Sequence, residues 1–210
     1  MAEWKKWEQA GDDRTRWHLN SARDTIYFCR EHISHGSFDA SETNHHIWNL
    51  KKKPPVPANL LKYKREAIQI FAEELAPFIE EMDIDDACMT WVPPSKAKND
   101  PKYDDRIERV VAIVCEKTGV APVEVFENKA TREPLHDNDE RRNPHAIAAN
   151  LKWCDCDLSE FDTIYIVDDV LTTGANFRAV TDKIREKFKD INIIGIVWAR
   201  AIDKPIEVPF

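Results

Sequence analysis

The chain has 210 residues and a mass of 24.4 kDa, a size typical of one full domain with an appended segment or of two small domains. Apolar residues make up 42% of it and aromatic residues 10%, which is enough for a buried core and excludes wholesale disorder. The 30 Lys and Arg residues and 38 Asp and Glu residues give a formal net charge of −8. An acidic chain is a poor general nucleic-acid binder, because the phosphate backbone attracts cationic surfaces.

Membrane and secretion signals are missing from the sequence. No apolar run approaches the ~20 residues that a bilayer span needs. Residues 1–9 contain two tryptophans and several charges, which is unlike a signal peptide. The five cysteines are odd in number and do not form the pattern of a secreted disulfide scaffold, so we expect reduced thiols and a cytoplasmic protein.

The first 83 residues are predicted to be helical. Ala22, Ile26, Cys29 and Ile33 recur at helical spacing, and a second, short helix is expected over 41–50. The proline-rich stretch at 54–57 breaks the pattern.

A longer helix follows the break, where apolar residues form one stripe at Leu61, Ile68, Phe71, Leu75, Phe78 and Met82. Pro77 lies inside this stripe and is expected to kink or end the helix. We therefore expect residues 1–83 to form a helical cap or lid that covers the strand tips of the following domain and forms part of its pocket.

Residues 84–210 are predicted to form an α/β core. Short apolar runs predict strands at 88–92, 123–126, 163–167 and 191–199. Helix-spaced apolar residues follow the first of these from Ile107 to Val114 and the third from Phe177 to Phe188. Apolar strands that alternate with amphipathic helices indicate a parallel sheet with helices on both faces, and ligands bind such sheets at the carboxyl ends of the strands.

The strand at 163–167 leads into the most informative stretch of the chain. It ends in Asp168 and Asp169, and the small-residue turn Thr172-Thr173-Gly174-Ala175-Asn176 then begins a helix. Free backbone N–H groups at a helix N-terminus can hold a phosphate, and glycine allows close approach. Adjacent carboxylates can bind sugar hydroxyls or order a hydrated Mg²⁺. The stretch therefore predicts a site for a phosphorylated sugar.

This stretch, Val167 to Asn176, closely resembles the motif with which type I phosphoribosyltransferases bind 5-phosphoribosyl 1-diphosphate (PRPP). The resemblance implies that Asp168 and Asp169 contact the ribose hydroxyls and Mg²⁺. It also implies that Val170, Leu171 and the turn from Thr172 to Asn176 (Thr172, Thr173, Gly174, Ala175, Asn176) surround the 5-phosphate. Asn176 departs from the usual Thr or Ser.

A weaker likeness extends over residues 86–200 and is closest to the competence-associated ComF-like branch. Pro94, Ser95 and Lys96 occupy the place of the pyrophosphate loop, and Tyr103-Asp104-Asp105-Arg106 leads into a helix as in that branch. Lys129, Arg132 and Arg141, in the segment from Asn128 to Asn143, are candidates for further phosphate contacts. Thr172 replaces the Asp that enzymes for 6-oxopurines carry, which argues against that branch.

The resemblance implies an α/β fold of the type I phosphoribosyltransferase kind and a transferase that takes PRPP, Mg²⁺ and a small-molecule acceptor. A homodimer is a further family expectation. Two alternatives stay open. The chain could be a non-catalytic regulator or partner-binding module on the same fold, because fold does not fix function. Hydrolysis of a nucleotide N-glycosidic bond would use a similar pocket.

Overall fold

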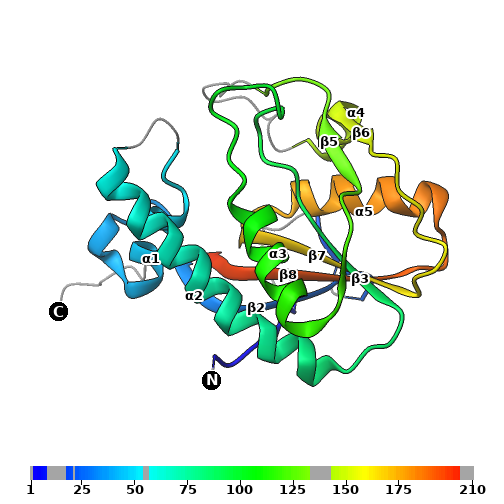
Figure 1. Cartoon of the computed structure of the whole chain (residues 1–210), viewed down its shortest axis with the longest axis horizontal. Helices are drawn as coiled ribbons and strands as arrows, with labels where there is room; N and C mark the ends of the chain where they lie inside the picture. Colours follow the sequence, from blue (N-terminus) through cyan, green and yellow to red (C-terminus); the bar gives the residue numbers. More distant parts are fainter. Residues whose placement is uncertain (1, 9–17, 21, 54–56, 133–142, 204–210) are drawn as a thin grey trace.

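The structure is a computed structural model, and it describes residues 2–8, 18–20, 22–53, 57–132 and 143–203. Its centre is a six-stranded sheet in the order β1-β2-β8-β7-β3-β4, parallel except for the β1–β2 pair (Figure 1). The strands are β1 (Lys5–Lys6), β2 (Thr25–Ile33), β3 (Ala87–Trp91), β4 (Ala121–Pro122), β7 (Thr163–Leu171) and β8 (Asn192–Ile202). The expectation of a mostly parallel α/β sheet is confirmed.

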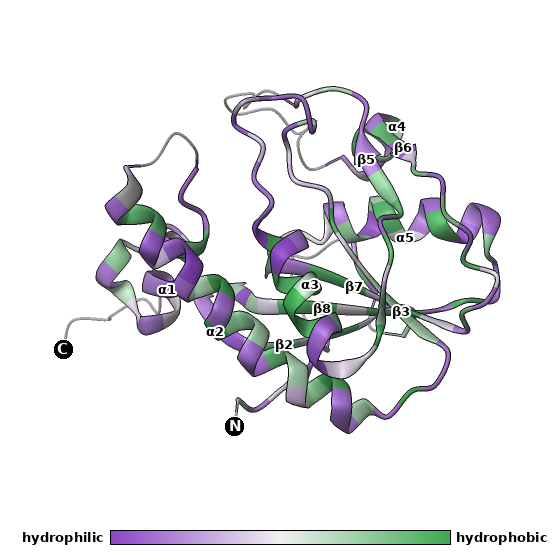
Figure 2. Ribbon diagram, viewed as in Figure 1, coloured by the Kyte–Doolittle hydropathy of each residue, from purple (hydrophilic) through white to green (hydrophobic). Residues whose placement is uncertain are grey.

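Helices cover both faces of this sheet, as expected. In the described residues, the α-helices are α1 (Glu42–Leu50), α2 (Ala58–Met82), α3 (Arg106–Thr118), α4 (Pro144–Asn150) and α5 (Ala175–Lys187), and Phe38–Ala40 forms a short 3-10 helix. Side chains alternate along β7, so Tyr165 packs in the core under α2 and α3, while Ile164 and Ile166 pack against α5. Figure 2 shows the apolar residues concentrated along the sheet and the helix faces turned toward it.

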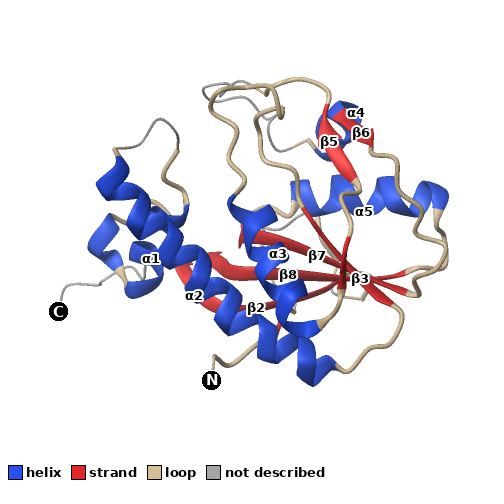
Figure 3. Ribbon diagram, in the orientation of Figure 1, coloured by secondary structure: helices blue, strands red, loops and turns tan. Residues whose placement is uncertain are grey.

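A smaller unit stands apart from the main sheet. Strands β5 (Phe126–Asn128) and β6 (Leu151–Trp153) pair antiparallel, with α4 between them in sequence (Figure 3). The strand expected at 123–126 is wrong over 123–125, because those residues belong to no strand and lie between β4 and β5, which are in different sheets. The intervening Val125 is fully buried, which explains its apolar character without a strand.

The helix predicted across Ala22–Ile33 is wrong. Residues Thr25–Ile33 form β2, which pairs in parallel with β8 inside the main sheet. Ile26 and Phe28 face one core while Tyr27 and Cys29 pack against the other, a period of two that β-branched and aromatic residues favour. Residues 1–83 are thus not wholly helical, and the boundary at residue 83 does not separate the sheet from the segment before it.

The other N-terminal helices are confirmed, with one difference. Ser41 caps α1 by accepting a hydrogen bond from the Asn44 N–H group at 3.0 Å. Helix α2 runs through Pro77 instead of ending there. Its stripe of Phe71, Leu75 and Ile79 is buried against the sheet, and this packing outweighs the hydrogen bond that proline removes.

The cysteines and the helix lengths also bear on what the sequence predicts. All five cysteines are free thiols. Among the helices in the described ranges, none has both the length and the apolar character needed to cross a lipid bilayer.

Candidate functional site

A pocket of about 860 Å³ opens at the carboxyl ends of β3 and β7. This is the edge at which parallel α/β sheets bind ligands, and the volume lies within the usual range for small-molecule sites. The walls come from the ends of β3 and β7, the loops that follow them, the start of α3, the α4 region and the turn after α1. The lining residues are Lys51, Trp91, Val92, Pro93, Pro94, Ser95, Tyr103, Asp104, Arg106, Ile107, Glu108, Thr131, Arg132, Ala146, Ile147, Asn150, Asp168, Asp169, Val170, Thr172 and Asn176.

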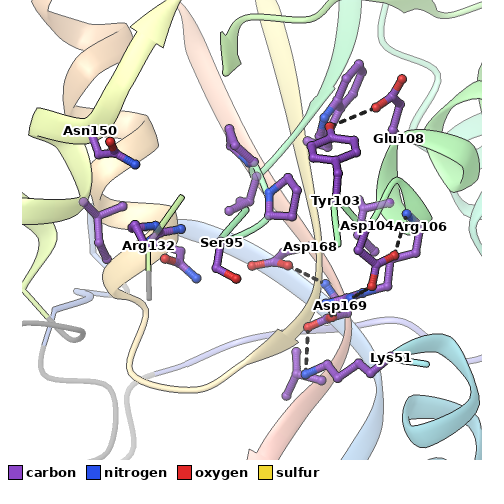
Figure 4. A pocket seen from close by; sticks show the side chains of 18 of the residues that line it. Lys51, Ser95, Tyr103, Asp104, Arg106, Glu108, Arg132, Asn150, Asp168 and Asp169 are labelled. Atoms are coloured by element: carbon purple, nitrogen blue, oxygen red, sulfur yellow. Dashed lines mark hydrogen bonds and ion pairs between the residues drawn. The ribbon is translucent and has the colours of Figure 1, made fainter. Parts of the chain in front are cut away.

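The structure distinguishes two acids that the sequence treats as equivalent. Asp168 and Asp169 both lie on β7, and successive strand residues point to opposite sides. The carboxylate of Asp168 is directed toward Ser95 across the pocket, whereas that of Asp169 meets Arg106 and Lys51 (Figure 4). The Asp169 N–H group also donates to Asp168 Oδ1 at 2.8 Å, which fixes the first carboxylate.

Both oxygens of Asp169 are engaged. Oδ2 accepts from Arg106 Nε at 3.0 Å and Nη2 at 2.6 Å, and Oδ1 lies 3.2 Å from Lys51 Nζ. Burial alone would raise the pKa of Asp169, but the Lys51 and Arg106 charges outweigh it and hold that pKa below its ordinary value. Asp169 is therefore ionised and internally paired, whereas the Asp168 carboxylate points across the pocket toward Ser95.

Arg106 also connects this pair to a second buried ion pair. Its Nη1 group donates to Asp104 Oδ2, and Asp104 Oδ1 accepts from Lys64 Nζ. The Lys64 ammonium further donates to the Lys52 carbonyl at 2.8 Å, which anchors the turn between α1 and α2. Burial lowers the pKa of Lys64 more than Asp104 raises it. Residues from α2, α3 and β7 are thus held in one charge network.

The turn after β7 has the features expected of an anion site. Gly174 has φ +79°, a left-handed conformation that glycine adopts without strain, and it immediately precedes α5. The Ala175 N–H group is satisfied weakly by Thr173 Oγ1 at 3.4 Å. Within the described part of the chain, the N–H groups of Thr173, Gly174 and Asn176 donate to no protein acceptor. Because these donors lie at a helix N-terminus, they favour a bound anion.

One side of this turn is packed and the other is open. A Cβ atom on Gly174 would lie 2.3 Å from Leu19 Cγ, so the N-terminal segment supports the turn from behind. Thr172 and Asn176 are exposed and line the pocket. Val170 also lines it, whereas Leu171, Thr173, Gly174 and Ala175 form the turn without contributing to the pocket wall.

The loop after β3 contributes Pro94 and Ser95 to the wall but not Lys96. The Lys96 ammonium lies 3.8 Å from Asp100, and its side chain is largely buried. Segment 128–132 holds this loop, because Arg132 N donates to the Ser95 carbonyl at 2.8 Å and Ala97 N donates to Thr131 Oγ1 at 3.1 Å. The structure therefore places Ser95, not the lysine beside it, where a ligand would bind.

The remaining predicted phosphate contacts have different outcomes. Arg132 lines the pocket, as predicted. The Lys129 ammonium donates to the Ala149 carbonyl at 2.7 Å and does not line it. Arg141 lies outside the described residues. Of the described residues before position 84, Lys51 is the one that lines the pocket, so the expected N-terminal wall is reduced to a single side chain.

Sequence reasoning missed Lys51 as a site residue and gave Arg106 no role. Arg106 had a signal, because the stretch Tyr103-Asp104-Asp105-Arg106 was part of the family likeness. Lys51 had none, since its approach to Asp169 depends on how α1 packs on β2. There Asn44, fully buried, bonds both the N–H and the carbonyl group of Ile33.

The pKa of Asp168 lies far above its ordinary value. Burial, and then the negative charge of Asp169, raise the pKa of Asp168 to about 7. A carboxylate with a raised pKa destabilises the folded state at any pH where it must ionise. This cost is complete above pH 7, declines as the pH falls through 7 and is gone below the unfolded pKa near 4.

We therefore predict that Asp168→Asn raises the free energy of unfolding at pH 8 by about 1–3 kcal/mol, a range reduced for partial solvent exposure. The amide oxygen still accepts from the Asp169 N–H group, so the geometry is kept. Urea unfolding at pH 8 and pH 5 measures the effect, and the gain should shrink at pH 5. An equal gain at both values would contradict the raised pKa.

The Mg²⁺ ion that the family likeness implies was compared with the available ligands. The described residues contain no group of three or more His, Cys, Asp or Glu side chains that could hold a metal. Asp169 and Asp104 are already paired with cations, which leaves Asp168 and Glu108, and Glu108 accepts a hydrogen bond from the Tyr103 hydroxyl at 3.2 Å. Mg²⁺ often keeps several waters and binds one or two carboxylates together with substrate phosphates. The residues thus fit a hydrated Mg²⁺ that arrives with a diphosphate and not an all-protein site.

The pocket brings together eight of the residues predicted from the motif and its surroundings: Pro94, Ser95, Arg132, Asp168, Asp169, Val170, Thr172 and Asn176. No family model and no curated protein matches the chain.

Proposed function

We propose that the chain is a phosphoribosyltransferase of the type I, ComF-like kind, which binds PRPP with Mg²⁺ and transfers its 5-phosphoribosyl group to a small acceptor. One observation carries the proposal. The turn at 172–176 offers, at the start of α5, N–H groups that donate to no acceptor among the described residues, beside a pocket that also contains Asp168 and Ser95. A phosphate site, a hydroxyl acceptor and a polar loop in one cavity match the three parts of PRPP.

Each part of the substrate has a counterpart in this chain. The N–H groups of the turn, with Thr172 and Asn176, would hold the 5-phosphate. The Asp168 carboxylate would accept hydrogen bonds from the ribose hydroxyls, and a charged acceptor makes such bonds stronger. Ser95 and the backbone of its loop would face the diphosphate. Mg²⁺, when bound with the substrate, supplies positive charge to the diphosphate oxygens.

The reaction would require little covalent chemistry from the protein. The bond from C1 to the diphosphate oxygen breaks, and the diphosphate leaves with the electron pair. The acceptor nucleophile forms the new bond to C1 and loses its proton to water. Catalysis would come from holding the two reactants in position and from stabilising charge as it develops.

Calorimetric titration of PRPP with Mg²⁺ tests the binding half of the proposal. At pH 8, where Asp168 is mostly ionised, we expect the wild-type protein to bind PRPP and the Asp168→Asn variant to bind it at least about tenfold more weakly, because an amide oxygen is a weaker acceptor than a carboxylate. Asp155→Asn is the control. It replaces an acid on the loop after β6, away from the pocket lining, and should bind as the wild type does.

Release of pyrophosphate with a panel of nitrogenous bases tests the transferase half. Turnover with any acceptor supports the enzyme. PRPP binding without turnover would favour the non-catalytic regulator, and cleavage of PRPP or a nucleotide by water alone would favour a hydrolase. If neither the wild type nor the variant binds PRPP, the proposal is wrong.

A further inference from the structure

Among the described residues, three cationic side chains line the pocket, and they come from distant parts of the chain. They are Lys51 in the turn after α1, Arg106 at the start of α3 and Arg132 beside the Ser95 loop. The two lysines that the sequence suggested for phosphate binding, Lys96 and Lys129, do not line it. A diphosphate is strongly anionic. Arg132 is already among the predicted phosphate contacts, so Lys51 and Arg106 are the two cations whose role is open.

The guanidinium of Arg106 is fully engaged by carboxylates of the protein. Its Nε, Nη1 and Nη2 atoms all donate to Asp104 or Asp169, and its side chain is 17% exposed. Burial alone would lower the pKa of Arg106, but the charges of Asp169 and Asp104 outweigh it and raise that pKa above its ordinary value. Removing this guanidinium from its two carboxylates would leave buried charges unpaired, which is costly. Arg106 therefore acts on Asp169 and Asp104 rather than on a ligand.

The ion pair with Asp169 does not use every N–H donor of the Lys51 ammonium. Its side chain is 41% exposed, and its ion pair with Asp169 Oδ1 is 3.2 Å long. A lysine ammonium carries three donors on a compact charge, so one can remain on Asp169 while the others face the pocket. Figure 4 shows the Lys51 ammonium joined to the Asp169 carboxylate, and Lys51 is one of the residues that line the pocket.

The backbone that carries Lys51 is fixed on both sides. Asn44 of α1 bonds Ile33 N at 3.0 Å and the Ile33 carbonyl at 3.1 Å, which attaches α1 to the end of β2. On the other side, the Lys64 ammonium bonds the Lys52 carbonyl. The charge of Lys51 also reaches the end of β2, because burial and then Lys51 lower the pKa of His32. A fixed backbone with a partly exposed cation is a preorganised anion contact.

We infer that Lys51, supplied by the N-terminal region to the pocket of the α/β sheet, binds the diphosphate group of the substrate. The inference rests on the proposed function and adds a residue that the motif does not contain. It also gives the segment before residue 84 a direct part in substrate binding. Asp169 then acts as a positioning residue, which orients Lys51 and Arg106.

Two probes separate this inference from the proposed function: inorganic pyrophosphate and ribose 5-phosphate, each titrated by calorimetry in the presence of Mg²⁺. We expect Lys51→Ala to weaken pyrophosphate binding about tenfold or more, as expected for loss of a charge-assisted contact, and to leave ribose 5-phosphate binding within about twofold. Lys51→Arg should restore most of the pyrophosphate affinity. Lys52→Ala is the matched control, because its ammonium contacts Asn49 and the Tyr63 ring outside the pocket, and it should change neither affinity.

Each result decides between the two statements. If the wild type binds both probes and Lys51→Ala leaves pyrophosphate binding unchanged, the inference is wrong and the proposed function stands. Equal losses for both probes would show that Lys51 acts through the shape of the site, which also overturns the inference. If the wild type binds neither probe, the proposed function itself fails. Thermal unfolding of Lys51→Ala, expected within a few degrees of the wild type, checks that the variant is folded.

Discussion

Gly174→Ala should destabilise the protein by about 2–5 kcal/mol and weaken PRPP binding more than tenfold. The backbone at Gly174 has φ +79°, which costs about 1–2 kcal/mol for a residue with a Cβ atom. The new Cβ would also lie 2.3 Å from Leu19 Cγ, and relieving such a contact costs typically about 1–3 kcal/mol. The turn that we assign to the 5-phosphate must shift to relieve it. Urea unfolding and calorimetric titration measure the two effects.

Gly119→Ala is the control that separates strain from collision. Gly119 ends α3 with φ +78°, almost the same backbone angle, but a Cβ atom there meets nothing within 4 Å. The Gly119→Ala variant should therefore lose only the free energy of unfolding that the strained backbone costs, about 1–2 kcal/mol, and it should bind PRPP as the wild type does.

A double variant then identifies the source of the collision. Leu19→Ala alone opens space in the core, but combined with Gly174→Ala it removes the clash, so the two losses should be less than additive by about 1 kcal/mol or more. Strictly additive losses would mean that Leu19 does not support the turn.

Arg106→Ala should cost about 3 kcal/mol at pH 7, because it leaves the buried carboxylates of Asp104 and Asp169 with one lysine partner each. The pKa of Asp169 lies below its ordinary value, so its ion pairs stabilise the folded state above the unfolded pKa near 4, and this contribution is lost as the pH falls through the folded pKa. The penalty for Arg106→Ala should thus be complete at pH 7 and smaller at pH 3. Urea unfolding at the two values measures it.

Arg109→Ala provides the comparison within the same helix. Arg109 forms no ion pair with a described residue, and its replacement should change stability by no more than about 0.5 kcal/mol. A loss at Arg106 no larger than that at Arg109 would contradict the charge network. An Arg106 penalty that does not depend on pH would contradict its electrostatic origin.

The core of the fold could be predicted because its signals are local. Three apolar runs, which form β3, β7 and β8, are buried on both faces of the sheet. Such runs leave few alternatives to a parallel sheet. The stretch 25–33 could not be read with the same rule, since Ile26, Cys29 and Ile33 match helical spacing while Ile26 and Phe28 match strand spacing. The stretch is a strand because it pairs with β8, 160 or more residues away in the sequence. No local pattern predicts such a pairing.

The site residues also differ in whether a local sequence signal predicts them. Asp168, Thr172 and Asn176 belong to one short motif, and the structure brings all three to the pocket. Lys51 and Arg106 reach Asp169 through packing between distant elements, so no spacing rule predicts these contacts, although the family likeness includes Arg106. Lys96 shows the opposite error: the sequence predicts it as a phosphate contact, but its ammonium lies 3.8 Å from Asp100 within its own loop.

A crystal structure of the protein soaked with PRPP and Mg²⁺ tests the central claim most directly. We predict density for the 5-phosphate on the N–H groups of Thr173, Gly174 and Asn176, with the ribose hydroxyls at Asp168. A phosphate bound elsewhere, or a turn left empty under saturating ligand, would contradict the assignment of this pocket to a phosphorylated pentose.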